Sequence, residues 1–382
     1  MSNILERNIF FYTRSMFCFR ASDQIDFLSN FSDPKDDIER SYNQYLCQVF
    51  FMRKWFYILS NIIAFLSFPF VIIFILFRSI TSQRKESLEC MSDLKGWMAI
   101  VPDELRDKYN IEMENWFSGI RLDLYDIKYI FLLICRYPLS PFFIIKNVIK
   151  IAKYSYMIYT YSSKIFVVHN EYSFTSSILT EYCHNKGVKH INIMHGEKII
   201  NIRDSFFHYD ICYIWNDYYR DLFCLMKAES SQFIVAIPPS LKIDCESYIN
   251  KKYYADYKYY LAFQTEDEMK SIHESMKFST MNGKVVKYRL HPTYSDARMI
   301  ERVVGKENVE YPQEVSIESS IANTIVVVGL YTTVLNQAYC CGKQIVLDDV
   351  TYNQEYTKLK ELGYIMIEKK SLRLSALMYN EI

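Results

Sequence analysis

The sequence predicts an α/β protein with two domains, each built around a parallel sheet. The chain has 382 residues, more than one hydrophobic core usually serves, so two domains are expected. From about residue 160 onward, short β-branched runs alternate with longer amphipathic stretches, which is typical of parallel strands connected by helices. Pro238, Pro239 and the Tyr-rich polar stretch 244–258 interrupt the alternation and indicate a linker. We therefore expect two Rossmann-like domains facing a cleft, over 1–243 and 259–382.

The alternation places each element within narrow limits. Strands are expected over 164–168, 188–194, 210–215 and 232–236, with helices over 173–185 and 218–227. Beyond the linker, strands are expected over 259–263, 284–290, 323–328 and 344–347, with helices over 266–278 and 333–341. Ser173 and Thr265 are expected N-caps, and Gly342 is expected just past a helix end. In the N-terminal 150 residues, 8–19 and 97–101 are the expected strands.

Composition excludes several classes of function. Lys plus Arg and Asp plus Glu both number 44, so no net charge drives binding to nucleic acid. The ten cysteines show no C-x-x-C pair and no zinc spacing with histidine, so we expect reduced thiols and no metal site. The N-terminus lacks the basic and apolar regions of a secretory signal peptide. These features together predict a protein that stays in a reducing compartment.

Residues 55–77 resemble a membrane segment. They carry no charge over 23 residues and are long enough to cross a bilayer. Basic residues flank both ends, with Arg53 and Lys54 before the segment and three more after it, so the positive-inside rule favours the cytosol at both ends. Pro69 would kink the segment near its middle. We expect a peripheral or re-entrant hairpin at the cytoplasmic face of the inner membrane; the alternative is a pair of buried core helices.

Polar residues follow two strands of the first predicted domain. In parallel sheets, ligands bind beyond the carboxyl ends of the strands. Glu171 lies in the sequence HNE after the strand 164–168, and His195 and Glu197 lie in HGEK after the strand 188–194. Carboxylate and imidazole groups at such positions predict a general base. For Glu171 the alternative is an acid at a helix N-terminus, where the helix dipole favours it.

Two further motifs follow strands of the second predicted domain. Arg289 and His291 flank the end of the strand 284–290, on one face by strand alternation, and Pro292 stops the strand. A guanidinium and an imidazole placed so predict a phosphate site. The second motif, formed by Gly329, Tyr331, Thr332 and Thr333, opens a helix after an apolar strand. Free N–H groups at a helix start bind anions, although ordinary capping by Thr332 or Thr333 would also explain these residues.

The order of these motifs resembles a group of bacterial surface-polysaccharide glycosyltransferases with the two-domain GT-B fold. H-G in the first domain, R-x-H-P in the second, and a Ser/Thr-rich helix start followed by G-K are similar to bacterial sialyltransferases and polysialyltransferases. They are also similar to capsule Kdo transferases and CDP-glycerol glycerophosphotransferases. The resemblance covers Phe166–Lys198 and Tyr288–Leu347. It implies that His291, Thr332 and Thr333 hold the donor phosphate, and that Glu171, His195 or Glu197 activates the acceptor hydroxyl.

The resemblance implies inverting transfer of a sugar from a nucleotide donor to a glycan or lipid-linked oligosaccharide, in capsule, O-antigen or lipooligosaccharide synthesis. We expect a CMP-linked acidic sugar such as sialic acid, although the acid-acid-Gly motif of the sialyltransferases is replaced by HNE and HGE. No D-x-D motif is present, so neither a metal nor another cofactor is expected. The alternatives are a UDP-, GDP- or CDP-linked donor, a nucleotide-sugar epimerase, and a non-enzymatic polysaccharide assembly protein.

Overall fold

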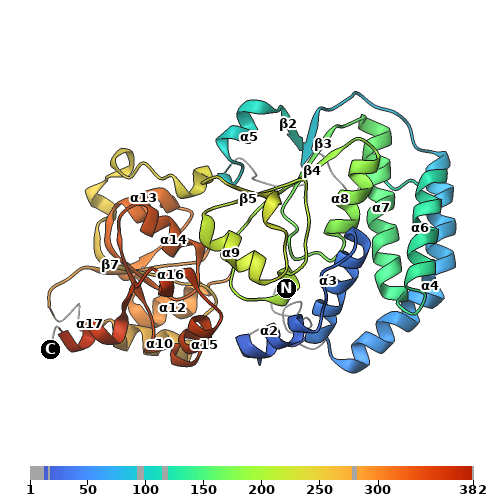
Figure 1. The fold of residues 1–382 in the computed structure, drawn as a ribbon. Coiled ribbons are helices and arrows are strands. Elements are labelled where there is room, and N and C mark those ends of the chain that lie inside the picture. Colours follow the sequence, from blue (N-terminus) through green and yellow to red (C-terminus); the bar gives the residue numbers. More distant parts are fainter. Residues whose placement is uncertain (1–12, 16–17, 93–98, 114–118, 278–281, 381–382) are drawn as a thin grey trace. The chain divides into compact units, whose positions relative to one another are not determined.

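The chain folds into two compact units, each an α/β structure of its own. The computed structural model describes residues 13–15, 18–92, 99–113, 119–277 and 282–380 (Figure 1). The first unit comprises Met1–His195 and Ile200–Ile237, and the second comprises Gly196–Ile199 and Pro238–Ile382. Each unit contains a six-stranded sheet in which all neighbouring strands are parallel. The predicted fold class, α/β with two Rossmann-like halves, is therefore confirmed.

In the first unit the strands lie in the order β2-β1-β3-β4-β5-β6. Their bounds are β1 Cys90–Ser92, β2 Ile111–Met113, β3 Ile165–Val168, β4 Lys189–Ile193, β5 Ile211–Ile214 and β6 Phe233–Val235. The helices of this unit are α2 Ala21–Ser29, α3 Asp37–Phe51, α4 Lys54–Ile80, α5 Asp103–Lys108, α6 Leu124–Arg136, α7 Pro141–Tyr161, α8 Ser176–Asn185 and α9 Asp217–Leu225. Strands β3, β4 and β5 match the predicted runs because their apolar residues contribute to one core cluster, in which Val167 and Ile191 are buried.

Three local predictions for this unit need correction or lie outside the description. Ser173 does not cap α8; its hydroxyl lies 2.9 Å from that of Thr175, the residue that precedes the first turn. The predicted strand 97–101 is absent where it is described, because residues 99–101 form a turn, and the sheet instead uses the short strands β1 and β2. Most of the predicted strand 8–19 lies outside the described residues, although Thr13 makes a single antiparallel bridge with Met52.

The apolar segment is one continuous helix rather than a hairpin. Helix α4 runs unbroken from Lys54 to Ile80 with Pro69 inside it. Proline removes one backbone hydrogen bond, but the apolar residues on both sides continue the helix. The alternative of buried core helices is not what the structure shows either, since most of its large side chains are exposed. Within the described residues, α4 is the one helix whose length and composition suffice to cross a bilayer.

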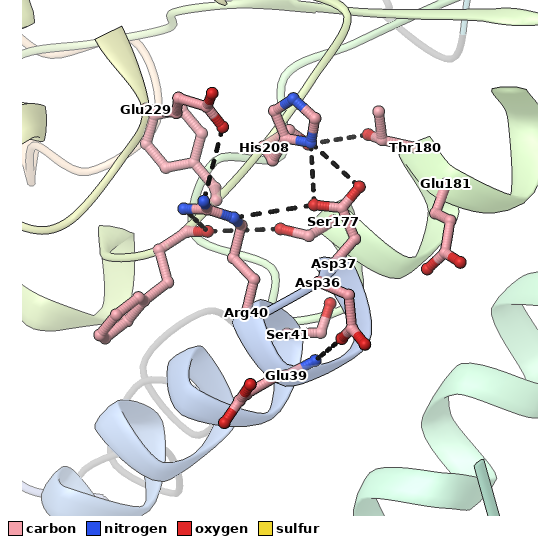
Figure 2. A network of polar contacts seen from close by, with 12 residues as sticks. Asp36, Asp37, Glu39, Arg40, Ser41, Ser177, Thr180, Glu181, His208 and Glu229 are labelled. Carbon is pink, nitrogen blue, oxygen red and sulfur yellow. Dashed lines mark hydrogen bonds and ion pairs between the residues drawn. The ribbon is translucent and has the colours of Figure 1, made fainter. Parts of the chain in front are cut away.

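Helix α3 is attached to the first sheet by a polar network around its N-terminus (Figure 2). The Asp37 carboxylate lies 2.8 Å from Nδ1 of His208, which precedes β5. Arg40 donates to the Lys227 carbonyl at 3.1 Å. Its guanidinium also lies 3.5 Å from the carboxylate of Glu229. Ser41 accepts a hydrogen bond from the backbone of Ile178 in α8. These contacts hold α3 against α8 and against the segments that precede β5 and β6.

In the second unit the strands lie in the order β12-β11-β10-β7-β8-β9. Their bounds are β7 Ala255–Tyr260, β8 Val286–Arg289, β9 Val309–Glu310, β10 Thr324–Gly329, β11 Gln344–Leu347 and β12 Leu372–Arg373. The helices are α10 Glu266–Ser275, α12 Ala297–Val304, α13 Ile317–Ala322, α14 Thr333–Cys340, α15 Asn353–Glu361, α16 Ile365–Glu368 and α17 Leu374–Asn380. Thr265 caps α10 in a capping box with Glu268, and Gly342 follows α14 with φ +69°, both as predicted.

The stretch 244–258, predicted as a linker, groups with the second unit. It contains two short 3₁₀ turns, Glu246–Tyr248 and Lys251–Tyr253, and most of β7. Asn323 ties the stretch to α13, because its amide donates to the Tyr248 carbonyl and its Oδ1 accepts from the backbone of Asn250. The polar, Tyr-rich composition therefore reflects an exposed entry into β7.

Candidate functional site

The strand order of the second unit indicates where a ligand would bind. From β7 the chain adds β8 and β9 on one side and then β10, β11 and β12 on the other, so the direction of strand addition reverses between β7 and β10. In open parallel sheets, ligands bind beyond the carboxyl ends of the two strands at such a reversal. The turns at 261–265 and 329–332 flank that position. These two turns and the neighbouring turn after β8 form the candidate site of this unit.

His291 is held in one tautomer by the turn that follows β8. Its Nδ1 accepts hydrogen bonds from the backbone N–H groups of Thr293 at 3.1 Å and Tyr294 at 3.3 Å. A ring nitrogen that accepts carries no proton, so the neutral ring carries its proton on Nε2. Partial burial lowers the pKa of His291, which favours this neutral form. His291 therefore presents an N–H donor, the group that a phosphate oxygen requires.

Ser295 connects His291 to the turn at the strand reversal. Its hydroxyl accepts from the backbone N–H of His291 at 2.8 Å and donates to the carbonyl of Ala262, beyond β7, at 3.0 Å. Pro292 follows His291 and ends the strand, as predicted. The sequence analysis missed Ser295, although a serine four residues after His291 is the signal that would have indicated it.

Arg289 is buried in an ion pair rather than directed to the same ligand as His291. Its Nη1 lies 2.7 Å from Oε1 of Glu310, its Nη2 donates to the Val315 carbonyl at 2.9 Å, and its side chain is 6% exposed. The other oxygen of Glu310 lies 2.6 Å from Nζ of Lys258, which is fully buried. In this structure the guanidinium is therefore already engaged, and Arg289 supports the turn that carries His291.

The helix start after β10 has the backbone order that the sequence indicates. Thr332 is the N-cap of α14, and its hydroxyl accepts from the N–H of Val334 at 3.4 Å, so ordinary capping accounts for this side chain. Thr333 is the first residue of the helix. Gly329 does not adopt a positive φ, and a Cβ there would meet the Tyr260 carbonyl at 3.5 Å, an ordinary contact distance. The glycine is thus not required by the backbone conformation.

Tyr331 binds the segment that carries Glu197. The Tyr331 hydroxyl donates to the Glu197 carbonyl at 3.2 Å, and its ring packs edge-on against the buried ring of Tyr364. The charge of Glu197 also reaches Lys369 of the second unit. Burial lowers the pKa of Lys369, and Cys340 and the negative charge of Glu197 partly offset this lowering. Glu197 therefore belongs with the second unit, although β4, the strand that precedes it, belongs to the sheet of the first unit.

In the first unit, the direction of strand addition reverses between β1 and β3. Residues 169–171 directly follow β3 and so lie beside this reversal. The rings of His169 and His195 meet edge to face there, with centroids 5.7 Å apart. His195 is exposed and His169 is half-buried. The structure thus brings the predicted His195 to a second imidazole that the sequence analysis did not select.

Glu171 is buried at 1% exposure and has a structural environment. The buried amide of Asn192 donates to Glu171 Oε2 at 3.3 Å and accepts from the backbone of Asn170 at 2.8 Å. Gln44 of α3 donates to the Glu171 carbonyl at 2.8 Å. Glu171 therefore fixes the loop between β3 and α8 instead of facing solvent. A polar Asn192 inside an apolar strand is the signal that could have revealed this anchor.

Among the residues that the structure describes, no group of three or more His, Cys, Asp or Glu side chains lies close enough to hold a metal ion.

Comparison with known proteins identifies similar solved structures. No protein-family model and no curated protein matches the sequence. A UDP-GlcNAc 2-epimerase from Neisseria meningitidis bound to UDP-GlcNAc is 12% identical, with a TM-score of 0.43 over 72% of this chain and 85% of that one. The lipopolysaccharide outer core galactosyltransferase WaaB is 10% identical, with a TM-score of 0.39 over 78% and 94%. Anabaena HepE, in complex with UDP and glucose, is 10% identical, with a TM-score of 0.38 over 77% and 98%. At these TM-scores the choice among functions rests on this chain's own residues.

Proposed function

We propose that the chain is a glycosyltransferase of surface-polysaccharide synthesis that takes a nucleotide-linked sugar as its donor. The observation that carries the proposal is the fixed tautomer of His291 beside the strand reversal of the second unit. Two backbone N–H groups occupy Nδ1, so the Nε2–H is the group left to donate to a ligand. The start of α14, on the other side of β7, adds the N–H of Thr333, whereas Thr332 already accepts hydrogen bonds from the N–H groups of Val334 and Leu335. A nucleotide phosphate is the ligand that both donors suit.

In the proposed reaction, His195 removes the proton from an acceptor hydroxyl. The hydroxyl oxygen then attacks the anomeric carbon of the donor sugar, and the bond from that carbon to the phosphate oxygen breaks with inversion. The negative charge that develops on the leaving phosphate is stabilised by the N–H donors of His291 and of the α14 start. Of the three predicted bases, His195 is the one proposed because it is exposed, whereas Glu171 is buried and Glu197 groups with the other unit.

The donor is identified by the nucleotide that stabilises the protein. We propose a CMP-linked acidic sugar and compare CMP with UDP, CDP and GDP in a thermal unfolding assay. Stabilisation by UDP alone would replace the CMP assignment while leaving the transferase intact. Conversion of a nucleotide sugar to its epimer without any acceptor would instead establish an epimerase. If no nucleotide raises the unfolding temperature, the donor site itself is refuted.

Two substitutions at one position separate the roles of the two ring nitrogens. In His291→Asn the side-chain oxygen can still accept the N–H groups of the turn, but the Nε2 donor is lost. In His291→Gln the amide nitrogen lies near the Nε2 position, but the Nδ1 acceptor is lost. We expect the Asn variant to weaken nucleotide binding about ten- to a hundredfold, the cost of one hydrogen bond to a charged group, and the Gln variant to retain more of it.

His273 provides the matched control for these variants. It lies on α10 of the same unit, where its Nδ1 is 3.0 Å from the Tyr288 hydroxyl. His273→Gln should leave nucleotide affinity unchanged. Equal losses in the His273 and His291 variants would show that histidine removal acts through the fold and would overturn the assigned role of His291.

A further inference from the structure

Helix α6 exposes an apolar stripe that the sequence analysis did not select. Leu124, Ile127 and Phe131 follow one another on one face of the helix and are 79%, 42% and 65% exposed. On the opposite face Tyr129 and Leu133 are buried against the rest of the first unit. A helix with apolar residues on both faces needs an apolar partner for the outer one.

Helix α4 presents a second exposed apolar face. Small or aliphatic residues at Ser60, Ala64 and Ile75 are buried against the unit. Its exposed large apolar side chains are Trp55, Ile58, Leu59, Ile62, Ile63, Phe65, Leu66, Phe70, Ile73, Phe74, Leu76, Phe77 and Ile80. Such an extent of exposed apolar surface marks an interaction site.

The faces of α4 and α6 belong to one surface. Figure 1 shows both helices with α7 in the same part of the first unit. An apolar groove of about 370 Å³ is lined by Phe65, Leu66 and Pro69 of α4, by Ile134 of α6, and by Pro138 and Ile144. The groove joins the two helices, and its size and apolar lining suit part of an acyl chain. We call the exposed apolar residues of α4 and α6 the α4–α6 surface.

The charges at the two ends of α4 are positive. Residues 40–85 contain no Asp or Glu, while Arg53 and Lys54 are exposed at one end of α4 and Arg78 is exposed at the other. Trp55 stands beside the first pair, as aromatic residues do at the level of lipid headgroups. Anionic headgroups would complement these cations. A second copy of the chain would add further cations to the same interface, so it fits less well.

Polar contacts hold α4 along the surface of the unit at both ends of its apolar part. Asn61 Oδ1 accepts from the backbone N–H of Phe142 at 3.2 Å, and the Ser79 hydroxyl accepts from that of Leu122 at 2.9 Å. These anchors are separated by roughly 27 Å along the helix at 1.5 Å per residue. If α4 crossed the bilayer in this state, α7 with Lys146 and Lys150 would have to enter it as well, at a large desolvation cost.

We propose that the α4–α6 surface binds the face of an anionic phospholipid bilayer, with α4 parallel to the membrane plane. The proposal is independent of the transferase proposal. The exposed stripes insert among the acyl chains, and the cations at the ends of α4 contact the headgroup phosphates. The cytoplasmic leaflet of a bacterial inner membrane provides such a surface.

Vesicle flotation tests the role of α6. The full-length protein is mixed with vesicles of phosphatidylcholine containing phosphatidylglycerol. Phe131→Asp should reduce the bound fraction at least about tenfold, because a charge replaces a buried apolar contact. Leu225→Asp, at a similarly exposed leucine on α9 of the same unit, is the matched control and should bind as the wild type does. Circular dichroism and thermal unfolding verify that both variants are folded. Unchanged binding of Phe131→Asp would refute the part assigned to α6.

A second pair of variants tests the charges. Arg53→Gln with Lys54→Gln should weaken binding to anionic vesicles about fivefold for each cation removed. Lys251→Gln with Lys252→Gln, an exposed pair in the second unit, should have no effect. Equal binding of the wild type to neutral and anionic vesicles would refute the electrostatic part of the proposal.

Two outcomes would replace the proposed arrangement. A wild-type dimer in solution that becomes a monomer in Phe131→Asp, without vesicle binding, would assign the surface to a second copy. An N-terminal tag protected from protease on vesicles that the protein bound from outside would show a crossing helix. Protease access to that tag, with the bound protein still released by alkaline wash, is the result that an in-plane helix requires.

Discussion

The buried ion network beneath His291 gives the sharpest test of the second unit. Glu310 lies 2.6 Å from Lys258 and 2.7 Å from Arg289, and these two cations are 0% and 6% exposed. Replacing Glu310 by Gln keeps the shape but leaves two buried positive charges without their carboxylate. Removing one partner of a buried pair costs about 3 to 5 kcal/mol. Because the whole stability of a domain is about 5 to 15 kcal/mol, this substitution should destabilise the second unit severely.

The position of the tryptophans makes the effect on each unit separable. No tryptophan occurs in the sequence of the second unit, and Trp55 and Trp215 lie in the first, so tryptophan fluorescence reports the unfolding of the first unit in urea. Hydrogen exchange of the β7 and β8 amides reports the second unit. Glu310→Gln should accelerate exchange in these strands by the factor equivalent to about 3 to 5 kcal/mol and leave the fluorescence transition unchanged.

The pH dependence of this variant has a definite sign. Burial lowers the pKa of Lys258, while the charge of Glu310 acts in the opposite direction, so loss of Glu310 lowers the pKa further. The unfolded chain then binds more protons than the folded one over the window below the ordinary lysine pKa, and stability rises with pH there. Glu307→Gln, at an exposed neighbour, is the control and should change stability by less than about 0.5 kcal/mol. A change below about 1 kcal/mol in Glu310→Gln would refute the reasoning.

Three further predictions concern titration and capping. Burial lowers the pKa of His190 to about 3, so between pH 6.5 and 3 the unfolded chain binds a proton there that the folded chain does not. The free energy of unfolding should therefore fall by about 1.4 kcal/mol per pH unit as the pH drops through this range. His190→Gln should remove this slope in acid denaturation. Burial acts to lower the pKa of His208, but the hydrogen bond and charge of Asp37 raise it overall. The protonated His208 therefore stabilises the fold, fully below pH 6.5, and this stabilisation is lost as the pH rises through the folded pKa. Asp37→Asn should abolish that loss in urea titrations at several pH values. Thr332→Ala should cost about 1 kcal/mol through the lost cap of α14, whereas Thr333→Ala should cost less than about 0.5 kcal/mol; equal effects measured by hydrogen exchange of α14 would contradict the assignment of the cap.

Residues in long periodic segments were predictable because their structure depends on neighbours in the sequence. The strand 344–347 has the predicted bounds, and β3, β4, β5, β6 and β8 lie within the predicted ranges. The capping box of Thr265 and the left-handed Gly342 also follow from local rules, since their hydrogen bonds join residues a few positions apart. β7 begins earlier than predicted because Ala255 and Tyr257 are buried by strands from elsewhere in the chain.

The candidate site was predicted in part. The turn after β8 and the helix start after β10 lie at the same edge of the sheet, on either side of β7, because the carboxyl ends of parallel strands share one edge. The sequence could not show that Glu310, 21 residues beyond Arg289, accepts a hydrogen bond from the guanidinium that is predicted to bind phosphate. It also could not show that α3 and Asn192 enclose Glu171.

By itself the sequence determined the α/β class, the positions of most strands, the caps, and the apolar character of 55–77. These depend on periodicity and short-range hydrogen bonds, which any stretch of chain carries with it. Tertiary structure alone decided which polar groups remain available: Arg289 and Glu171 are engaged by residues distant in sequence, whereas His291 retains a donor. It also decided that the apolar segment is one helix beside α6, because burial and ion pairing depend on which distant segments pack together.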